Sequence, residues 1–108
     1  MKPKLPDIVQ RYVDASNAHD SSAIASCFSD IAIVQDERNT HHGKESIERW
    51  AAETINKYKF QFKPVGINGE DSDIVASIEV SGTFDGSPVT LEYRFRIENG
   101  LISSLAIS

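Results

Sequence analysis

The sequence is poor in features that mark exported, membrane-bound or nucleic-acid-binding proteins. Cys27 is the only cysteine in 108 residues, so no disulfide can form within the chain. No apolar run is long enough to span a bilayer, and no apolar segment follows the two lysines near the N-terminus to make a secretory signal. The formal net charge is −5, with acids and bases interspersed. We therefore expect a cytoplasmic protein with neither a nucleic-acid nor a membrane partner.

Several catalytic motifs are also missing. The sequence has no Gly-rich phosphate loop and no G-x-S-x-G nucleophile motif. His41 and His42 are adjacent, and adjacent residues of an extended chain point in opposite directions, so we expect surface histidines and no metal site. One of the two could instead line the mouth of a pocket. Cys27 lies on an apolar helical face, which favours a buried, unreactive thiol.

The composition is that of an ordinary globular protein. Hydrophobic residues make up 40% of the chain, which has five Phe, three Tyr and one Trp. A chain of this length has room for one hydrophobic core. We therefore expect a single domain over residues 1–108.

Hydrophobic periodicity predicts helices first and strands afterwards. Apolar residues recur at helical spacing in residues 7–18, in a short segment that Asp20 can cap, and in residues 44–57. A β-branched run predicts a strand over 31–36 before a loop, and alternation with a period of two predicts later strands. These later strands are expected at 58–63, 73–84, 88–97 and 101–108. The predicted fold class is α+β, with a curved antiparallel sheet wrapped around helices.

Asp36 ends the first predicted strand. Alternation places it on one face with Ala32 and Val34, but either face of this strand could be the inner one. If the face of Asp36 is inward, the carboxyl group lies in an apolar pocket, where poor solvation raises the pKa of an acid toward the range useful for a general base. The alternative is a solvated acid that begins a loop.

Two tyrosines fall at predicted inward positions. Tyr12 lies on the apolar stripe of the first helix, and Tyr93 lies on the inner face of the strand over 88–97. Two phenols aimed into one cavity could donate hydrogen bonds to a ligand oxygen and stabilise an enolate. They could equally be packing residues with hydroxyls at the rim. Trp50 is predicted as a core anchor of the third helix or as a wall for ligand stacking.

Several segments together resemble two families of proteins. The segments are "IVQRYVDASNAHDSSAIASCFSDIAIVQD", "HHGKESIERW", "GTFDGSP" and "FRIENGLISSLAIS". They resemble the SnoaL-like and ketosteroid-isomerase-like families of the nuclear-transport-factor-2-like superfamily, from about Pro6 to Ser108. The resemblance implies a cone-shaped α+β barrel of cystatin-like topology, with N-terminal helices packed in the curved sheet and a pocket inside.

The resemblance also implies roles for individual residues. "IVQRY" places Tyr12 at the oxyanion-hole tyrosine of the isomerases, and "AIVQD" places Asp36 at their general base. "YRFRI" places Tyr93 where the isomerases have a protonated aspartic acid. A phenol can also donate a hydrogen bond, and this position is where the sequence departs from the isomerase pattern.

The implied activity is cofactor-free proton transfer on an apolar ketone or enone, such as a steroid or polyketide fragment. Isomerisation and aldol-type cyclisation both fit. A non-catalytic protein that binds small hydrophobic ligands, or a dimeric interaction domain of the same fold, is the alternative. A homodimer through the outer face of the sheet is expected in each case, and Glu37, Arg38 and His42 could tune polarity at the mouth. The predicted ligand contacts are Val34, Trp50, Phe60, Ile78, Leu91 and Phe95.

Overall fold

Three helices and six strands form the computed structural model, which describes residues 4–36, 39–70 and 72–108. The helices are α1 (Asp7–Asn17), α2 (Ser21–Ser26) and α3 (Lys44–Tyr58), and the strands are β1 (Phe28–Asp36), β2 (Asn39–His42), β3 (Gln61–Glu70), β4 (Asp73–Ser81), β5 (Val89–Glu98) and β6 (Leu101–Ile107). The predicted α+β fold is confirmed. No helix of the described ranges is long and apolar enough to cross a membrane.

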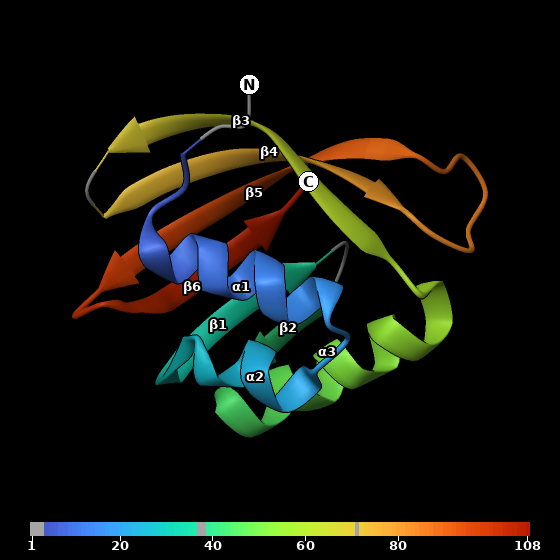
Figure 1. Ribbon diagram of the computed structural model, residues 1–108. Coiled ribbons are helices and arrows are strands. Elements are labelled where there is room, and N and C mark those ends of the chain that lie inside the picture. Colours follow the sequence, from blue (N-terminus) through green and yellow to red (C-terminus); the bar gives the residue numbers. More distant parts are fainter. Residues whose placement is uncertain (1–3, 37–38, 71) are drawn as a thin grey trace.

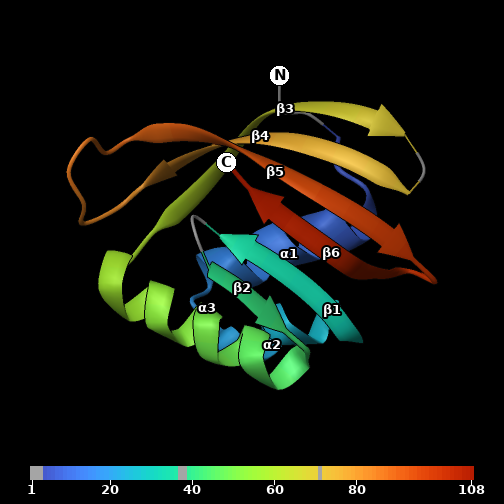
Figure 2. The same ribbon diagram turned by 180° about the vertical axis from the view of Figure 1, so that it is seen from behind.

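The six strands make one curved sheet in the order β2-β1-β6-β5-β4-β3. All neighbouring strands are antiparallel except β1 and β6, which pair in parallel. Figure 2 shows β2, β1, β6 and β5 following one another across the sheet. The parallel pair joins the first strand to the last one, because the helices and the meander of β3 to β6 bring the chain back to its start.

The helices lie inside the curve of the sheet (Figure 1). The inner stripe of α1 is fully buried, and it includes Val9, Tyr12 and Val13. Helix α1 begins after Pro6, and Asp7 lies in its first turn without capping it. At α2 the carboxylate of Asp20 accepts a hydrogen bond from the backbone N–H of Ala23 at 3.0 Å, as a helix cap does.

Strand β1 differs from the prediction in its start and its surroundings. It begins at Phe28, and an irregularity between Phe28 and Ile33 interrupts its pairing with β6. Ala32 and Val34 are buried and Ile33 is exposed, so Asp36 lies on the inward-facing side of the strand. The predicted loop before Gly43 contains β2, a short strand of mostly exposed polar residues that carry little hydrophobic signal.

The hairpin between β4 and β5 is tied to the C-terminal end of α3. The backbone N–H and hydroxyl of Thr83 both donate to the backbone oxygen of Tyr58, at 2.7 and 3.0 Å. A Cβ atom at Gly82 would collide with that same oxygen, so glycine permits this close approach. Figure 1 shows the orange hairpin loop reaching out on the same side as the last turn of α3.

Candidate functional site

A cavity of about 390 Å³ lies between the helices and the inner face of the sheet. This volume is in the range of small-molecule sites. Helix α3 and the hairpin loop 82–88 contribute to its walls. The described lining residues are Tyr12, Ser16, Ile24, Asp36, Trp50, Ala51, Thr54, Tyr58, Phe60, Phe62, Val80, Phe84, Asp85, Gly86, Val89, Leu91, Tyr93 and Ile107.

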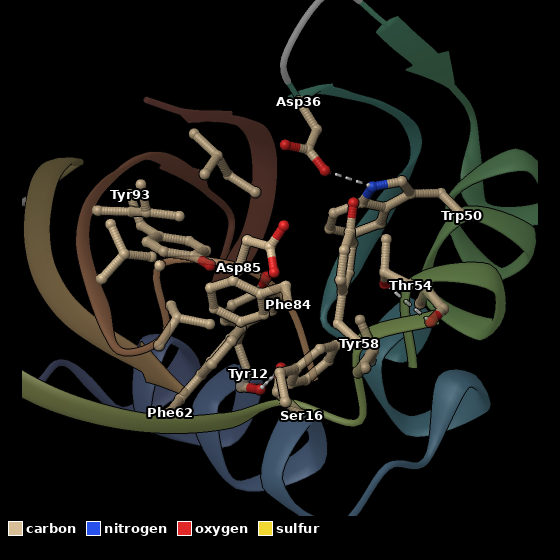
Figure 3. Close-up of a pocket in the computed structure, with 18 residues that line it drawn as sticks. Tyr12, Ser16, Asp36, Trp50, Thr54, Tyr58, Phe62, Phe84, Asp85 and Tyr93 are labelled. Carbon is tan, nitrogen blue, oxygen red and sulfur yellow. Dashed lines mark hydrogen bonds between the residues drawn. The ribbon is translucent and has the colours of Figure 1, made fainter. Parts of the chain in front are cut away.

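The Asp36 side chain is fixed by Trp50. The indole Nε1–H of Trp50 donates a hydrogen bond to Oδ2 of Asp36 at 3.0 Å (Figure 3). Trp50 is buried on α3, and the ring of His41 lies beside it with a centroid distance of 5.9 Å. One carboxylate oxygen is therefore held by the indole, and among the described residues the other oxygen has no hydrogen-bond donor.

Tyr12 and Tyr93 bring two phenol groups into the same cavity. They are only 2% and 3% exposed, and their ring centroids are 6.3 Å apart. The side chain of Ser16 forms a hydrogen bond with the side chain of Tyr12 and lowers the pKa of its phenol. Both tyrosines line the cavity, so their hydroxyls are placed to donate hydrogen bonds to a ligand oxygen.

The register of the sheet sets the spacing between Asp36 and Tyr93. Asp36 pairs with Ile107 across β1 and β6, and Ile107 pairs with Tyr93 across β6 and β5. Laterally paired residues project to the same face of a sheet, so all three line the cavity. Two strand spacings separate the Cα atoms of Asp36 and Tyr93 by about 10 Å, and Ile107 lies between them in this row.

Helix α1 and strand β3 hold the remaining aromatic wall in place. The Asn17 side chain accepts from the backbone N–H of Phe62 and donates to its carbonyl oxygen, at 2.6 and 3.0 Å. His19 is half-buried in the turn after α1, and its Nε2 lies 2.6 Å from the backbone oxygen of Phe60. These contacts turn the stacked rings of Phe60 and Phe62 toward the cavity.

Burial controls the ionisation of both tyrosines. It raises the pKa of Tyr12 well above its usual value of 10.0, and the neighbouring Tyr93 and Asp36 raise this pKa further. Burial also raises the pKa of Tyr93, with an additional contribution from the charge of Asp36. Both phenols therefore stay protonated at neutral pH and keep the hydrogen that an oxyanion donor needs.

These raised pKa values predict a loss of stability in alkali. Both tyrosines ionise near pH 10 in the unfolded chain but only at higher pH in the folded one. Their contribution to the free energy of unfolding is therefore complete below about pH 10 and is lost as the pH rises above it. Each should lower the free energy of unfolding by about 1.4 kcal/mol per pH unit in that window. Urea unfolding between pH 9 and 12 measures this slope. The double variant Tyr12→Phe/Tyr93→Phe should lose stability less steeply, and an equal slope would contradict the prediction.

The predicted site residues divide into two groups. Asp36, Tyr12 and Tyr93 line the cavity, as do Trp50, Phe60 and Leu91. The other predicted ligand contacts, Val34, Ile78 and Phe95, are buried in the hydrophobic core and do not line it. The alternation of apolar residues in the sequence could not distinguish cavity-lining residues from core residues. It identifies the inner face of a strand, but it does not show which inner positions a helix covers.

The structure also adds residues that the sequence analysis missed. Tyr58, Phe84 and Asp85 line the cavity where α3 meets the hairpin loop. The rings of Tyr58 and Phe84 meet edge to face, with centroids 5.8 Å apart. "FDGSP" marks a turn, but nothing in the sequence indicates that this turn folds back over a pocket.

The remaining candidate groups lie outside the cavity. Burial raises the pKa of the Cys27 thiol, which contacts the backbone oxygen of Ala23, as expected for an unreactive cysteine. His42 is exposed. Within the described ranges no cluster of three or more His, Cys, Asp or Glu side chains could hold a metal ion. Glu37 and Arg38, predicted at the mouth, lie outside the described residues.

Comparison with protein families decides where this fold belongs. A family model described as the SnoaL-like domain matches residues 9–105. The chain belongs to the SnoaL-like family. None of the curated proteins compared with this SnoaL-like chain matches it.

Solved structures agree with this assignment. A protein from Sinorhizobium meliloti named as a "putative polyketide cyclase" is 36% identical, with 96% of this chain and 95% of that one covered and a TM-score of 0.92. A hypothetical protein with a ketosteroid isomerase-like fold from Catenulispora acidiphila, in complex with trimethylamine, is 18% identical (97% and 86% covered, TM-score 0.86). A cystatin-fold protein from Novosphingobium aromaticivorans is 17% identical (94% and 95% covered, TM-score 0.81). The predicted family and the cystatin-like topology of the SnoaL-like chain are thereby confirmed.

Proposed function

We propose that this SnoaL-like protein catalyses proton transfer at a carbon next to a ketone carbonyl, with Asp36 as the base and Tyr12 and Tyr93 as oxyanion donors. One observation carries the proposal. Two buried tyrosines share a cavity with a carboxylate that an indole N–H orients. The step requires no cofactor, because the chain supplies both the base and the hydrogen-bond donors.

The chemistry proceeds through an enolate. Asp36 takes a proton from the carbon beside the carbonyl, the C–H electron pair forms the enolate double bond, and the carbonyl π electrons move to the oxygen. Tyr12 and Tyr93 donate hydrogen bonds to this oxyanion. In isomerisation, Asp36 returns the proton to the far carbon of the enone. In cyclisation, the enolate carbon attacks a second carbonyl, and the resulting alkoxide takes the proton from Asp36.

The expected substrate is an apolar ketone or enone, such as a steroid or polyketide fragment. The aromatic rings that line the cavity support an apolar substrate, and so does similarity to the Sinorhizobium protein named as a polyketide cyclase. A direct assay is the conversion of 3-cyclohexenone to conjugated 2-cyclohexenone, followed by ultraviolet absorbance. The proposal predicts a rate above that of buffer and of heat-unfolded protein. If neither this isomerisation nor deuterium exchange beside the carbonyl is accelerated, a non-catalytic binding protein with the same cavity is the better assignment.

Trp50 acts in this proposal as a positioning residue for Asp36. The variant Trp50→Phe removes the indole N–H, and we expect kcat to fall roughly 10- to 100-fold, the value of a hydrogen bond to a charged group. KM for a neutral ketone should change much less. A double-mutant cycle separates positioning from packing: in an Asp36→Asn background, Trp50→Phe should have little further effect on the rate. Equal losses in both backgrounds would mean that Trp50 acts independently of Asp36.

The homodimer through the outer face of the sheet stays a prediction. Ile31 and Ile33 support it, because both project away from the core and are 87% and 36% exposed. Apolar side chains exposed together on one strand are typical of a protein interface. The dimer is compatible both with the enzyme and with a binding protein of the same fold.

A further inference from the structure

The charges around the cavity are unbalanced. Its described lining residues include two acids, Asp36 and Asp85, but no lysine, arginine or histidine. Glu37 and Arg38, outside the described residues, have opposite formal charges. Among the described lining residues, a positive charge on a ligand would therefore meet carboxylates and no competing cation.

The two acids occupy different parts of the cavity. Asp36 is half-buried at the end of β1 and bonded to Trp50, whereas Asp85 is exposed on the hairpin loop that edges the cavity. Figure 3 shows Asp85 as a separate carboxylate, next to Phe84. The proposed reaction uses Asp36 and has no task for Asp85.

Aromatic rings accompany Asp85. Tyr58 and Phe84 line the cavity and meet edge to face. The faces of aromatic rings attract ammonium groups, and this attraction strengthens where water is excluded. The ring of Tyr58 already receives one cation, because Nζ of Lys57 lies 5.1 Å from its centroid, although Lys57 itself does not line the cavity.

We infer that the cavity takes a ketone whose other end carries an ammonium group, held by Asp85, Tyr58 and Phe84. This inference rests on the proposed function, since it names the substrate class of the same site. The ketone oxygen then lies at Tyr12 and Tyr93, and the cation lies at the hairpin loop. A fully apolar ketone would make no use of the Asp85 carboxylate.

The test compares two ligands that differ in one atom. The cationic ligand is trimethyl(4-oxopentyl)ammonium, and 6,6-dimethylheptan-2-one is its neutral counterpart with carbon in place of nitrogen. Trp50 is the only tryptophan, so its indole N–H gives a single NMR signal that reports on binding beside Asp36. We expect the cation to bind about tenfold more tightly at low salt. Equal or weaker binding of the cation than of the neutral ketone, or no measurable binding of the cation, would overturn the inference.

A matched pair of variants tests the position of the cation. Asp85→Asn should remove most of the preference for the cation, that is, lower the ratio of the two affinities several-fold. Glu53→Gln removes the same charge from an exposed position of α3 that does not line the cavity, and it should keep the preference. An equal loss in both variants would reveal only attraction to the negative net charge and would overturn the assignment to Asp85.

Deuterium exchange beside the carbonyl of the same two ligands separates this inference from the proposed function. Preferential binding of the cation without catalysed exchange would support the substrate class but contradict proton transfer. Catalysed exchange with equal affinity for both ligands would support proton transfer and overturn the substrate class.

Discussion

Asp36→Asn should lower kcat for isomerisation by roughly 10²- to 10⁴-fold, the usual contribution of a general base. An amide cannot accept the proton from carbon, although its oxygen can still accept the hydrogen bond from Trp50. The affinity for a neutral ketone should therefore change only a few-fold. Initial rates over a range of ketone concentrations measure both quantities.

The control for this variant is the same substitution at an aspartate that does not line the cavity. Asp14 is exposed on α1 and does not line the cavity, so Asp14→Asn should keep the wild-type rate. The Trp50 indole signal should stay near its wild-type position in Asp36→Asn, because the hydrogen bond persists. If Asp36→Asn keeps its rate while folded, proton abstraction by Asp36 is wrong.

Tyr12→Phe should lower kcat by roughly 10²- to 10³-fold, as removal of one oxyanion donor does. Its effect on stability should be small. The Tyr12 ring packs edge to face on Phe95 with a centroid distance of 5.4 Å. Phenylalanine keeps this packing and adds no unpaired polar group.

The contrast between activity and stability is the essential measurement. Urea unfolding at pH 7 should give a free energy within about 1 kcal/mol of wild type, the net value of one hydrogen bond. A large loss of stability would show that the hydroxyl has a structural role. An unchanged kcat would remove Tyr12 from the reaction, and Tyr93→Phe would then show whether Tyr93 alone stabilises the oxyanion.

Much of the fold follows from local patterns. Helix α1 and strand β5 have clean apolar periods, so their ends were predicted within one or two residues. Strand β2 was missed because its residues are polar and its stability comes from pairing with β1. The early start of β1 was missed because the irregularity before Ile33 breaks the alternation.

The candidate site could be predicted only in part. Tyr12, Asp36 and Tyr93 were proposed from resemblance. The hydrophobic pattern alone did not decide whether Asp36 begins a solvated loop or lies in a pocket. The bond from Trp50 to Asp36 joins residues 14 positions apart on different elements. No local pattern encodes such a contact. Asp85 reaches the cavity only because the hairpin packs against the end of α3, and that contact depends on the whole fold.

The place of β6 between β1 and β5 has a consequence for folding. Asp36 and Tyr93 lie on strands that are not neighbours in the sheet. Ile107 of β6, the strand between them, pairs with both residues. Until β6 inserts, the two residues have no fixed separation. Pairing of β1 with β6 also closes a loop of about 70 residues, a non-local event that is slow compared with forming a hairpin. During refolding, recovery of ligand binding should therefore lag behind the formation of the β4–β5 hairpin.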